Sequence, residues 1–465
     1  VDAVGLITAR NGIVVGSGIT LSKDGDGFFT GIVTATFAGD GTNLTGVAST
    51  DDIRTNTNAT FLQNINVGVA ITAGKLGIGF TDTNIKIGNT ALDSLTVSNG
   101  NNIAVGHHAL TATTTGYSNI GVGGNALDAN TTGYNNVAVG KDALGQNTEG
   151  FENVAVGKDA LPSNSTGDYN IGIGVQALNA NTTANDNTAV GWNAMAVNST
   201  GNQCTAVGSR ALKANTTSTH NTAVGYVAME DNTTGYNNTG IGKGALSNNT
   251  TGNTNTAVGC DALNSNTTTS NNTAVGESAL QLNTAADNTA VGSGAMDANT
   301  TGTQNAAVGR NALGANTTAN DNTAMGFNAL AANTTGTSNT AFGVKAVDAC
   351  TTGSHNTGVG AYALTYATTS DYNTAVGMEA LKDDTTGSDC CAFGRQALAN
   401  NTTTNSNCAF GSVALFTQTD GGTKNCAFGN STLYSNTTGD SNCAFGDAAL
   451  YTNTTGSRNI AIGDY

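Results

Sequence analysis

Eight cysteines are the residues of this chain whose type is best suited to chemistry. Four of them recur at steps of 17 or 18 residues, each two residues before a phenylalanine: Cys391, Cys408, Cys426 and Cys443. A column of thiols could bind a soft metal ion or form disulfides. No CxxC pair or histidine accompanies them, and neighbouring parallel strands would hold their Cβ atoms in a poor disulfide geometry. We therefore predict no metal site, and we interpret these cysteines as small buried residues that compensate for larger phenylalanines. The other four are Cys204, Cys260, Cys350 and Cys390.

The four histidines are the next candidates for catalysis. None of His107, His108, His220 and His355 has a serine, cysteine or carboxylate at the spacing of a catalytic motif, so we expect solvated loop residues. Glycines in GVGG and TGIGKG resemble phosphate-binding loops, but such glycines recur throughout the chain and open no long helix. Acidic residues are scattered, without the carboxylate pair that a glycan depolymerase would need. We predict no enzyme activity, no catalytic residue and no cofactor.

Two surface features could serve recognition. The NTT and NST sequences match N-glycosylation sequons, for example at Asn130, Asn164, Asn181 and Asn198. Turn chemistry explains them without sugar, because Asn and Thr side chains bond to nearby backbone and Gly accepts positive φ. Aromatic residues stand at variable places, where they form either a contact surface or scattered exposure: Tyr117, Tyr134, Phe151, Trp192 and Tyr236.

A short repeat must position all of these residues. A glycine marker recurs 22 times from Gly106 to Gly463, in steps of 17 apart from one step of 16 and one of 18. The consensus is N-T-A-V-G-x-x-A-L-x-x-N-T-T-G-x-x, numbered below as positions 1 to 17. A fixed short period over this length is typical of a solenoid. We predict an all-β fold, a β-solenoid (β-roll) of about 22 coils that stack at roughly 4.8 Å into a rod on the order of 100 Å long.

The size pattern within the repeat predicts which side chains face inward. Positions 2 and 4 are mostly bulky, whereas position 3 is only Ala or Gly, so we expect a strand with positions 2 and 4 in the core beside position 9. Positions 6, 7, 10 and 11 should be exposed. Positions 8 and 9, usually Ala and Leu, favour either a second short strand or one helical turn per coil. Asn occupies position 1 in 20 of 22 copies, which predicts a stacked amide ladder.

The small residues at positions 3, 5 and 8 also bear on assembly. A face of Ala and Gly, with Thr432 as the one exception, indicates that something presses closely on it, and a lone coil buries too little apolar surface to offset its ordering cost. We expect two further copies of the chain on this face, giving a homotrimeric fibre. The alternative is the opposite wall of the same coil, which would leave a monomer.

Composition limits the other partners. The 465 residues include 62 Gly and a single Pro, which suits long hydrogen-bonded ladders. The net charge is −16 and basic residues do not cluster, so we expect no nucleic-acid partner. No run of 18 apolar residues is present, so we expect no membrane span.

The N-terminal region has a different pattern. Residues 1 to about 90 lack the 17-residue step but alternate like short strands, so we predict a β-rich fibre segment over 1–90 and a solenoid shaft over 91–465. The stretch NIKIGNTAL at 84–92 is similar to a degenerate first coil. At the other end the sequence stops in mid-coil at NIAIGDY, so we expect further residues or a covering subunit there.

Two resemblances follow from these motifs. The NTAVGxxAL units over about 102–463 resemble the head repeats of trimeric autotransporter adhesins. The stretch GIVTATFAGDGTNLTG at 31–46 resembles repeats in tail-fibre-like virion proteins of marine cyanophages. Both imply a trimeric, elongated, extracellular or virion fibre.

From these resemblances we expect a structural protein of a phage tail fibre or related appendage, which attaches to a host-surface glycan or receptor. A bacterial adhesin head is the nearest alternative. An ice-binding solenoid, with paired threonines of each NTTG in hydroxyl rows, is an alternative from another class.

Overall fold

The computed structural model describes residues 83–96 and 100–465. The chain divides into two compact units, Val1–Gly77 and Ile78–Tyr465. The described residues all belong to the second unit. The strands predicted within residues 1–82, and the fibre-like stretch at 31–46, lie outside the described residues.

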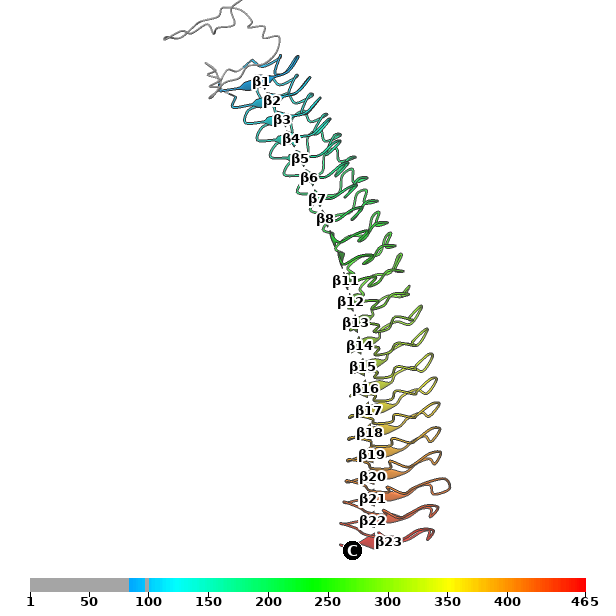
Figure 1. Cartoon of the computed structure of the whole chain (residues 1–465). Coiled ribbons are helices and arrows are strands. Elements are labelled where there is room, and N and C mark those ends of the chain that lie inside the picture. The colour runs from blue at the N-terminus through cyan, green and yellow to red at the C-terminus, as the bar shows by residue number, and fades with distance from the viewer. Residues whose placement is uncertain (1–82, 97–99) are drawn as a thin grey trace, which may run out of the picture. The chain divides into compact units, whose positions relative to one another are not determined.

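The described part is a parallel β-solenoid with one three-residue strand per coil (Figure 1). Each strand pairs in register with the strands of the preceding and following coils, so that Thr222, Thr239 and Thr256 stack on one another. The strands are β1 (Ile85–Ile87), β2 (Ile103–Val105), β3 (Ile120–Val122), β4 (Val137–Val139), β5 (Val154–Val156), β6 (Ile171–Ile173), β7 (Thr188–Val190), β8 (Thr205–Val207), β9 (Thr222–Val224), β10 (Thr239–Ile241), β11 (Thr256–Val258), β12 (Thr273–Val275), β13 (Thr289–Val291), β14 (Ala306–Val308), β15 (Thr323–Met325), β16 (Thr340–Phe342), β17 (Thr357–Val359), β18 (Thr374–Val376), β19 (Cys391–Phe393), β20 (Cys408–Phe410), β21 (Cys426–Phe428), β22 (Cys443–Phe445) and β23 (Ile460–Ile462). The predicted solenoid with its 17-residue period is therefore confirmed, and β1 shows that residues 84–92 do begin a coil.

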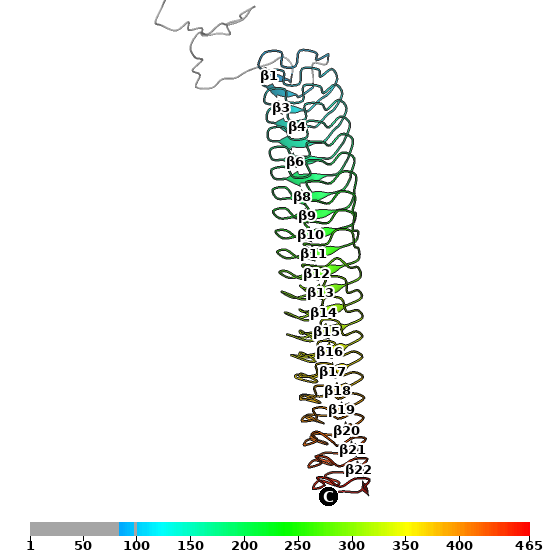
Figure 2. The ribbon, with the colours of Figure 1, turned by 90° about the vertical axis from the view of Figure 1, so that its right-hand side faces the viewer.

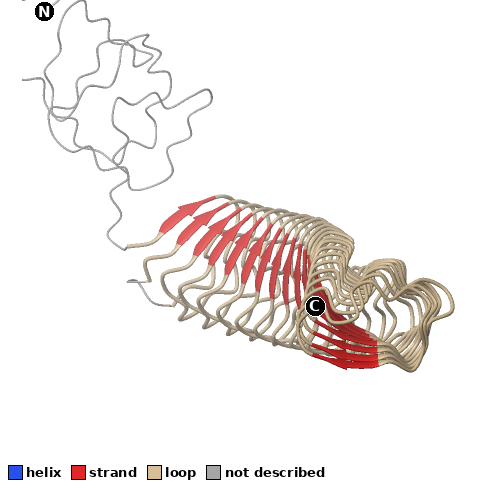
Figure 3. Cartoon of the chain, turned by 90° about the horizontal axis from the view of Figure 1, so that it is seen from below, coloured by secondary structure: helices blue, strands red, loops and turns tan. Residues whose placement is uncertain are grey.

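The stacked strands form one wall of the solenoid, and turns form the rest of each coil (Figures 2 and 3). The second wall, at positions 8 and 9, is neither the strand nor the helical turn that the sequence suggested. Leu212 and Met229, both at position 9, have φ of +51°, a left-handed conformation that is uncommon for residues other than Gly. Their backbone still bonds from coil to coil, since the Leu212 N–H donates to the Ala228 carbonyl at 2.9 Å. The second wall is thus a ladder of turns.

The interior is lined by the small residues, which reverses the predicted orientation of the strand. Ala223 at position 3, Ala228 at position 8 and Met229 at position 9 are fully buried. Thr222 and Val224, at positions 2 and 4, point outward and are only partly buried. The core assignment for position 9 is confirmed, whereas that for positions 2 and 4 is wrong. The physical reason is a narrow interior. Gly240 occupies position 3 of its coil, and a Cβ added to it would lie only 2.8 Å from Cγ of Met229, so the interior has no room for a large side chain there.

The glycine at position 5 is also explained by coil stacking. Gly225 has φ of +137°, and a Cβ there would lie 2.5 Å from the carbonyl oxygen of Gly242 in the next coil. The opposite wall and the neighbouring coils therefore press on positions 3, 5 and 8, as the monomer alternative proposed. The inference that partner chains cover this small face is wrong.

Two ladders of asparagine side chains run through the solenoid. In the first amide ladder, at position 1, Asn221 accepts from the backbone N–H of Asn238 at 2.9 Å and donates to the Gly235 carbonyl at 2.7 Å. This ladder confirms the prediction made from position 1. The second amide ladder, at position 12, was not predicted. There Asn249 donates from Nδ2 to Oδ1 of Asn232 at 2.8 Å. The two ladders lie side by side, because Asn221 and Asn232 both donate to the Gly235 carbonyl, and their buried amides connect successive coils.

Candidate interaction surface

The outward side of the strand wall is the most extensive unusual surface of the described coils. We call it the sheet face and define it by the side chains at positions 2 and 4, that is, the first and last residue of every strand. None of these residues is charged. Several large apolar members are well exposed, including Ile173 (39%), Ile241 (39%) and Phe342 (52%). A long, uncharged and largely apolar surface of this kind is typical of an interaction site.

The composition of the sheet face changes along the stack. Strands β1 to β6 place Ile or Val at both positions. Strands β7 to β18 place Thr at position 2, with Ala306 as the exception, beside Val, Ile, Met or Phe. Strands β19 to β22 pair Cys with Phe, and β23 returns to Ile. The face is therefore most apolar near its two ends and carries hydroxyls in the middle.

The cysteine column lies on this face. The rings beside it are stacked, with centroids 4.8 Å apart between Phe393 and Phe410 and 4.7 Å apart between Phe410 and Phe428. Cys391, Cys408, Cys426 and Cys443 are partly buried free thiols on the surface rather than core residues, which corrects the predicted burial. Burial raises the pKa of Cys408 to about 11, and the neighbouring thiols add to the rise. Thiols with a raised pKa are weak nucleophiles near neutral pH.

The other cysteines stand mostly in the amide ladders. Cys204 and Cys390 replace the asparagine of position 1, and Cys350 replaces that of position 12. All three are buried, and burial raises the pKa of Cys204 to about 11 and those of Cys350 and Cys390 to about 12. Within residues 83–96 and 100–465, no cluster of three or more His, Cys, Asp or Glu residues is arranged to hold a metal ion.

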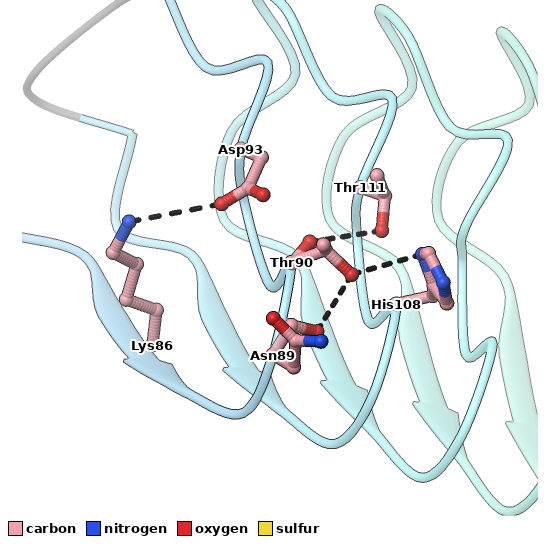
Figure 4. Close-up of polar contacts among 6 residues, drawn as sticks. All are labelled: Lys86, Asn89, Thr90, Asp93, His108 and Thr111. Atoms are coloured by element: carbon pink, nitrogen blue, oxygen red, sulfur yellow. Dashed lines mark hydrogen bonds and ion pairs between the residues drawn. The ribbon is translucent and has the colours of Figure 1, made fainter.

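The histidines contact hydroxyls and rings. His108 Nδ1 lies 2.9 Å from the Thr90 hydroxyl, next to an ion pair at 4.0 Å between Lys86 and Asp93 (Figure 4). The rings of His107 and His108 meet edge to face at 3.9 Å. His220 Nδ1 lies 2.9 Å from the Thr219 hydroxyl, and the His355 ring stacks on Tyr372 at 4.9 Å. These contacts do not build an acid–base pair.

The asparagines of the sequons are interior residues. Asn130, Asn164, Asn181 and Asn198 belong to the second amide ladder and are fully buried. Their Nδ2 atoms are engaged, as in the bond from Asn164 to Oδ1 of Asn147 at 2.9 Å. A glycan on these nitrogens would break the ladder, so in the folded chain these sequons serve structure.

The two threonines of each NTTG turn differ in hydrogen bonding and in exposure. At position 13 the Thr233 hydroxyl donates to the Thr250 carbonyl of the next coil at 3.0 Å. At position 14 Thr234 is exposed. The turn therefore presents one free hydroxyl row, not the two rows that the ice-binding alternative assumed.

Aromatic rings at the surface fall into two groups. Tyr117, Tyr134 and Phe151 stack at 4.9 and 4.8 Å, so their neighbours cover most ring faces. Trp192 and Tyr226, both at position 6, are each 52% exposed, and neither takes part in a ring stack among the described residues. They are two coils apart, roughly 10 Å by strand spacing.

No protein-family model matches the chain, and no curated protein sequence matches it. Among the described residues, no helix has the length and the apolar character needed to cross a membrane. The sheet face and the second amide ladder are the features that sequence reasoning missed. The recurrent Asn of every NTT was the signal for the second amide ladder, whereas the strict Ala or Gly at position 3 fits either orientation of the strand.

Proposed function

We propose that the chain is a structural fibre protein of a phage tail fibre or a related extracellular appendage, and that its copies associate through the sheet face. The observation that carries this proposal is the outward, uncharged and largely apolar surface that follows every strand from β1 to β23. A bacterial adhesin head would use the same surface. In this proposal the protein is not an enzyme and functions outside the cell or on a virion.

The size of the sheet face supports association. Three residues per strand span about 10 Å, and 23 strands at about 4.8 Å span about 110 Å. Each partner would therefore contribute on the order of 1,000 Å², which exceeds the roughly 800 Å² per partner of a standard stable interface. The proposed interface is thus on the opposite side of the strand from the small residues at position 3.

Three chains is the assembly that the resemblance to trimeric repeats suggests. Three-fold symmetry would bring one sheet face from each chain to a common axis and would close the assembly, so that no copy keeps an open apolar face. Light scattering on the purified chain tests this directly. We expect a multiple of 46.2 kDa, and a stable folded monomer at micromolar concentration would contradict the proposal.

Charged substitutions locate the interface. Val207→Lys with Ile241→Lys places two cations on the sheet face, where both native side chains are exposed. We expect dissociation into folded chains, because association would have to desolvate unpaired charges. Val197→Lys is the matched control, since Val197 is 44% exposed but lies at position 11, away from the sheet face. Equal dissociation by both variants would place the contact elsewhere.

For attachment, we propose that a neutral glycan binds across Trp192 and Tyr226. Ser209 stands between them at position 6, so no third ring fills the space between Trp192 and Tyr226, where a sugar ring could stack. Arg210 beside them is held by an ion pair with Glu230. Trp192→Ala with Tyr226→Ala should abolish retention on a glycan array, whereas Tyr134→Ala, which alters a stacked column, should not. Unchanged retention would remove this site and leave the fibre proposal standing.

Ice binding stays as the second candidate because of one observation. Strands β7 to β18 present rows of threonine hydroxyls and aliphatic side chains on the sheet face, for example Thr222 beside Val224. Both functions would use the same face, so ice binding requires that the face is free in a monomer, whereas the fibre requires that it is covered by other copies. Thermal hysteresis from a monomer would favour ice binding, and its absence from an associated form would favour the fibre.

A further inference from the structure

The second amide ladder is interrupted in three consecutive coils. Position 12 holds Asn in 13 successive coils from Asn130 to Asn333, and again at Asn401. Between them it holds Cys350, Ala367 and Asp384. The amide links that join other coils are therefore missing across this stretch, which we call the interrupted segment, residues 350–384.

The interruption leaves buried polar atoms without partners. Oδ1 of Asn333 has no hydrogen-bond partner, since Cys350 supplies no amide in the next coil. The Ser370 hydroxyl of the coil that contains Ala367 is likewise buried and makes no hydrogen bond of normal geometry. In an intact coil the corresponding oxygen accepts a bond, as Oδ1 of Asn232 does from Asn249 at 2.8 Å. Unsatisfied buried groups of this kind lower the cost of local opening.

Asp384 places a carboxyl group in the same segment. It is fully buried. One carboxyl oxygen accepts from Nδ2 of Asn401 at 2.9 Å, and the other lies 3.5 Å from Nδ2 of Asn373. Burial raises its pKa from 3.8 to about 7, and the neighbouring polar groups of Asn401, Ser370 and the Gly387 backbone only partly oppose this rise.

Few charged groups surround this carboxyl. Its pKa is set by burial and uncharged groups, without a basic partner among them. The titratable group that it influences is the buried thiol of Cys390 in the next coil, whose pKa it helps to raise after the larger effect of burial. On its own coil, Lys382 and Asp383 precede it and are partly exposed. An ionised Asp384 would therefore be a buried charge without a cation, which strongly disfavours the closed coil.

We propose that the interrupted segment is a pH-responsive weak point of the solenoid, which opens locally when Asp384 is ionised and closes when Asp384 is protonated. A protonated carboxyl has the shape of the asparagine amide and carries one donor, which the asparagine of an intact coil directs to the carbonyl at position 15, as Asn232 does to Gly235. An ionised carboxyl has no donor and gains access to water when the coil opens. Nearest-neighbour contacts confine this opening, because each coil contacts only the coils beside it.

The native cysteines provide both a probe and an internal reference. Cys390 follows Asp384 by six residues, and Cys204 follows Asn198 by the same six residues in an intact part of the ladder. Both thiols are buried. Labelling with a small thiol reagent, read by peptide mass spectrometry, reports the opening at each site. The ratio of the two rates cancels the effect of pH on the thiolate itself. The substitution Cys391→Thr removes the adjacent thiol. Threonine is chosen because Thr374 occupies the same position one coil earlier.

We expect the ratio of Cys390 to Cys204 labelling to rise roughly tenfold between pH 6 and pH 8 and then to level off, as linkage to a group with a pKa near 7 requires. In Asp384→Asn, which restores the usual ladder residue, the ratio should not vary with pH. A flat ratio in the native chain, or an unchanged rise in Asp384→Asn, would overturn the proposal.

A transfer experiment tests the carboxyl in isolation. Asn198→Asp in a chain that also carries Asp384→Asn exchanges the two roles, so that Cys390 becomes the reference. We expect labelling of Cys204 now to rise with pH relative to Cys390. A Cys204 that stays independent of pH would show that the carboxyl is not the responsive group and would overturn the assignment. Circular dichroism of each variant at pH 6 verifies that it is folded.

Discussion

Asn401 donates a hydrogen bond from its side-chain amide to the buried carboxyl of Asp384 over 2.9 Å. The corresponding hydrogen bond in an intact coil runs from the side-chain amide of Asn249 to Oδ1 of Asn232, at 2.8 Å. The substitution of one oxygen for one nitrogen therefore retains the acceptor of the ladder but makes its donor depend on protonation.

The first prediction concerns the stability of the whole chain against pH. The pKa of Asp384 is raised from 3.8 to about 7, so the folded state binds a proton that the unfolded state has released. The free energy of unfolding therefore falls by at most about 4 kcal/mol as pH rises from about 4 to about 7, and it is constant above pH 7. Asp384→Asn should remove this component. Denaturant melts of both chains between pH 4 and pH 8 measure it, and parallel pH profiles would contradict it.

The second prediction tests the orientation of the strand with two adjacent residues. Ala223 is fully buried, whereas Val224 faces outward. Ala223→Leu should destabilise its coil by about 1–3 kcal/mol or more, because the interior has no room for added methylenes. Val224→Leu should change stability by less than about 0.5 kcal/mol. If Val224→Leu were the more damaging substitution, the assignment of the interior would be wrong.

This pair also shows what could be predicted from sequence. The period, the strand location and the first amide ladder follow from spacing alone, since a repeated residue in a solenoid must stack on itself. The direction of the strand does not follow, because alternation of Ala and Val fits either orientation. Large apolar size usually indicates burial. Here a coil of 17 residues is too narrow for two bulky layers, so Ala packs inside and Val224 points outward.

The left-handed backbone at Leu212 could not be predicted for a related reason. Intrinsic preference disfavours positive φ for Leu, and only the stacking of identical coils compensates for it. The interaction surface was missed together with the orientation, because side chains assigned to the core cannot also be assigned to a surface.

The third prediction compares two glycines. A Cβ at Gly225 would lie 2.5 Å from the carbonyl oxygen of Gly242, in a backbone conformation with φ of +137°. A Cβ at Gly124 would meet nothing within 4 Å. Gly225→Ala should therefore separate neighbouring coils and lower the melting temperature, whereas Gly124→Ala should leave it unchanged. Thermal unfolding followed by circular dichroism distinguishes the two, and comparable losses would argue against stacking as the cause.

The fourth prediction removes one amide from the second amide ladder. Asn232→Ala deprives Asn249 of its acceptor and Gly235 of a donor. Loss of buried hydrogen-bond partners should cost about 1–3 kcal/mol for each group left unsatisfied. Thr234→Ala, two residues away at an exposed position, is the control and should be nearly neutral. Hydrogen exchange of the adjacent coils would reveal whether the loss is local.

The fifth prediction uses the cysteine column to detect association. If sheet faces meet about a three-fold axis, the Cys408 thiols of different chains approach one another, as do the Cys426 thiols, although all are free in the single chain. A disulfide-forming oxidant should then yield covalent oligomers on a non-reducing gel. A variant with Thr at positions 391, 408, 426 and 443 should lose them, while the partly buried Cys260 is retained as a control thiol. Monomers alone after oxidation of the native chain would contradict contact through this part of the face.

The hydrogen bonds between coils have a mechanical consequence, because they run along the stack rather than across it. A tensile load between the two ends of the solenoid acts on the bonds of one coil boundary at a time. Each coil that detaches removes about 4.8 Å of stack but releases 17 residues, or about 58 Å of extended chain. Under tension the chain therefore lengthens in steps, and the size of each step is set by the number of residues in one coil.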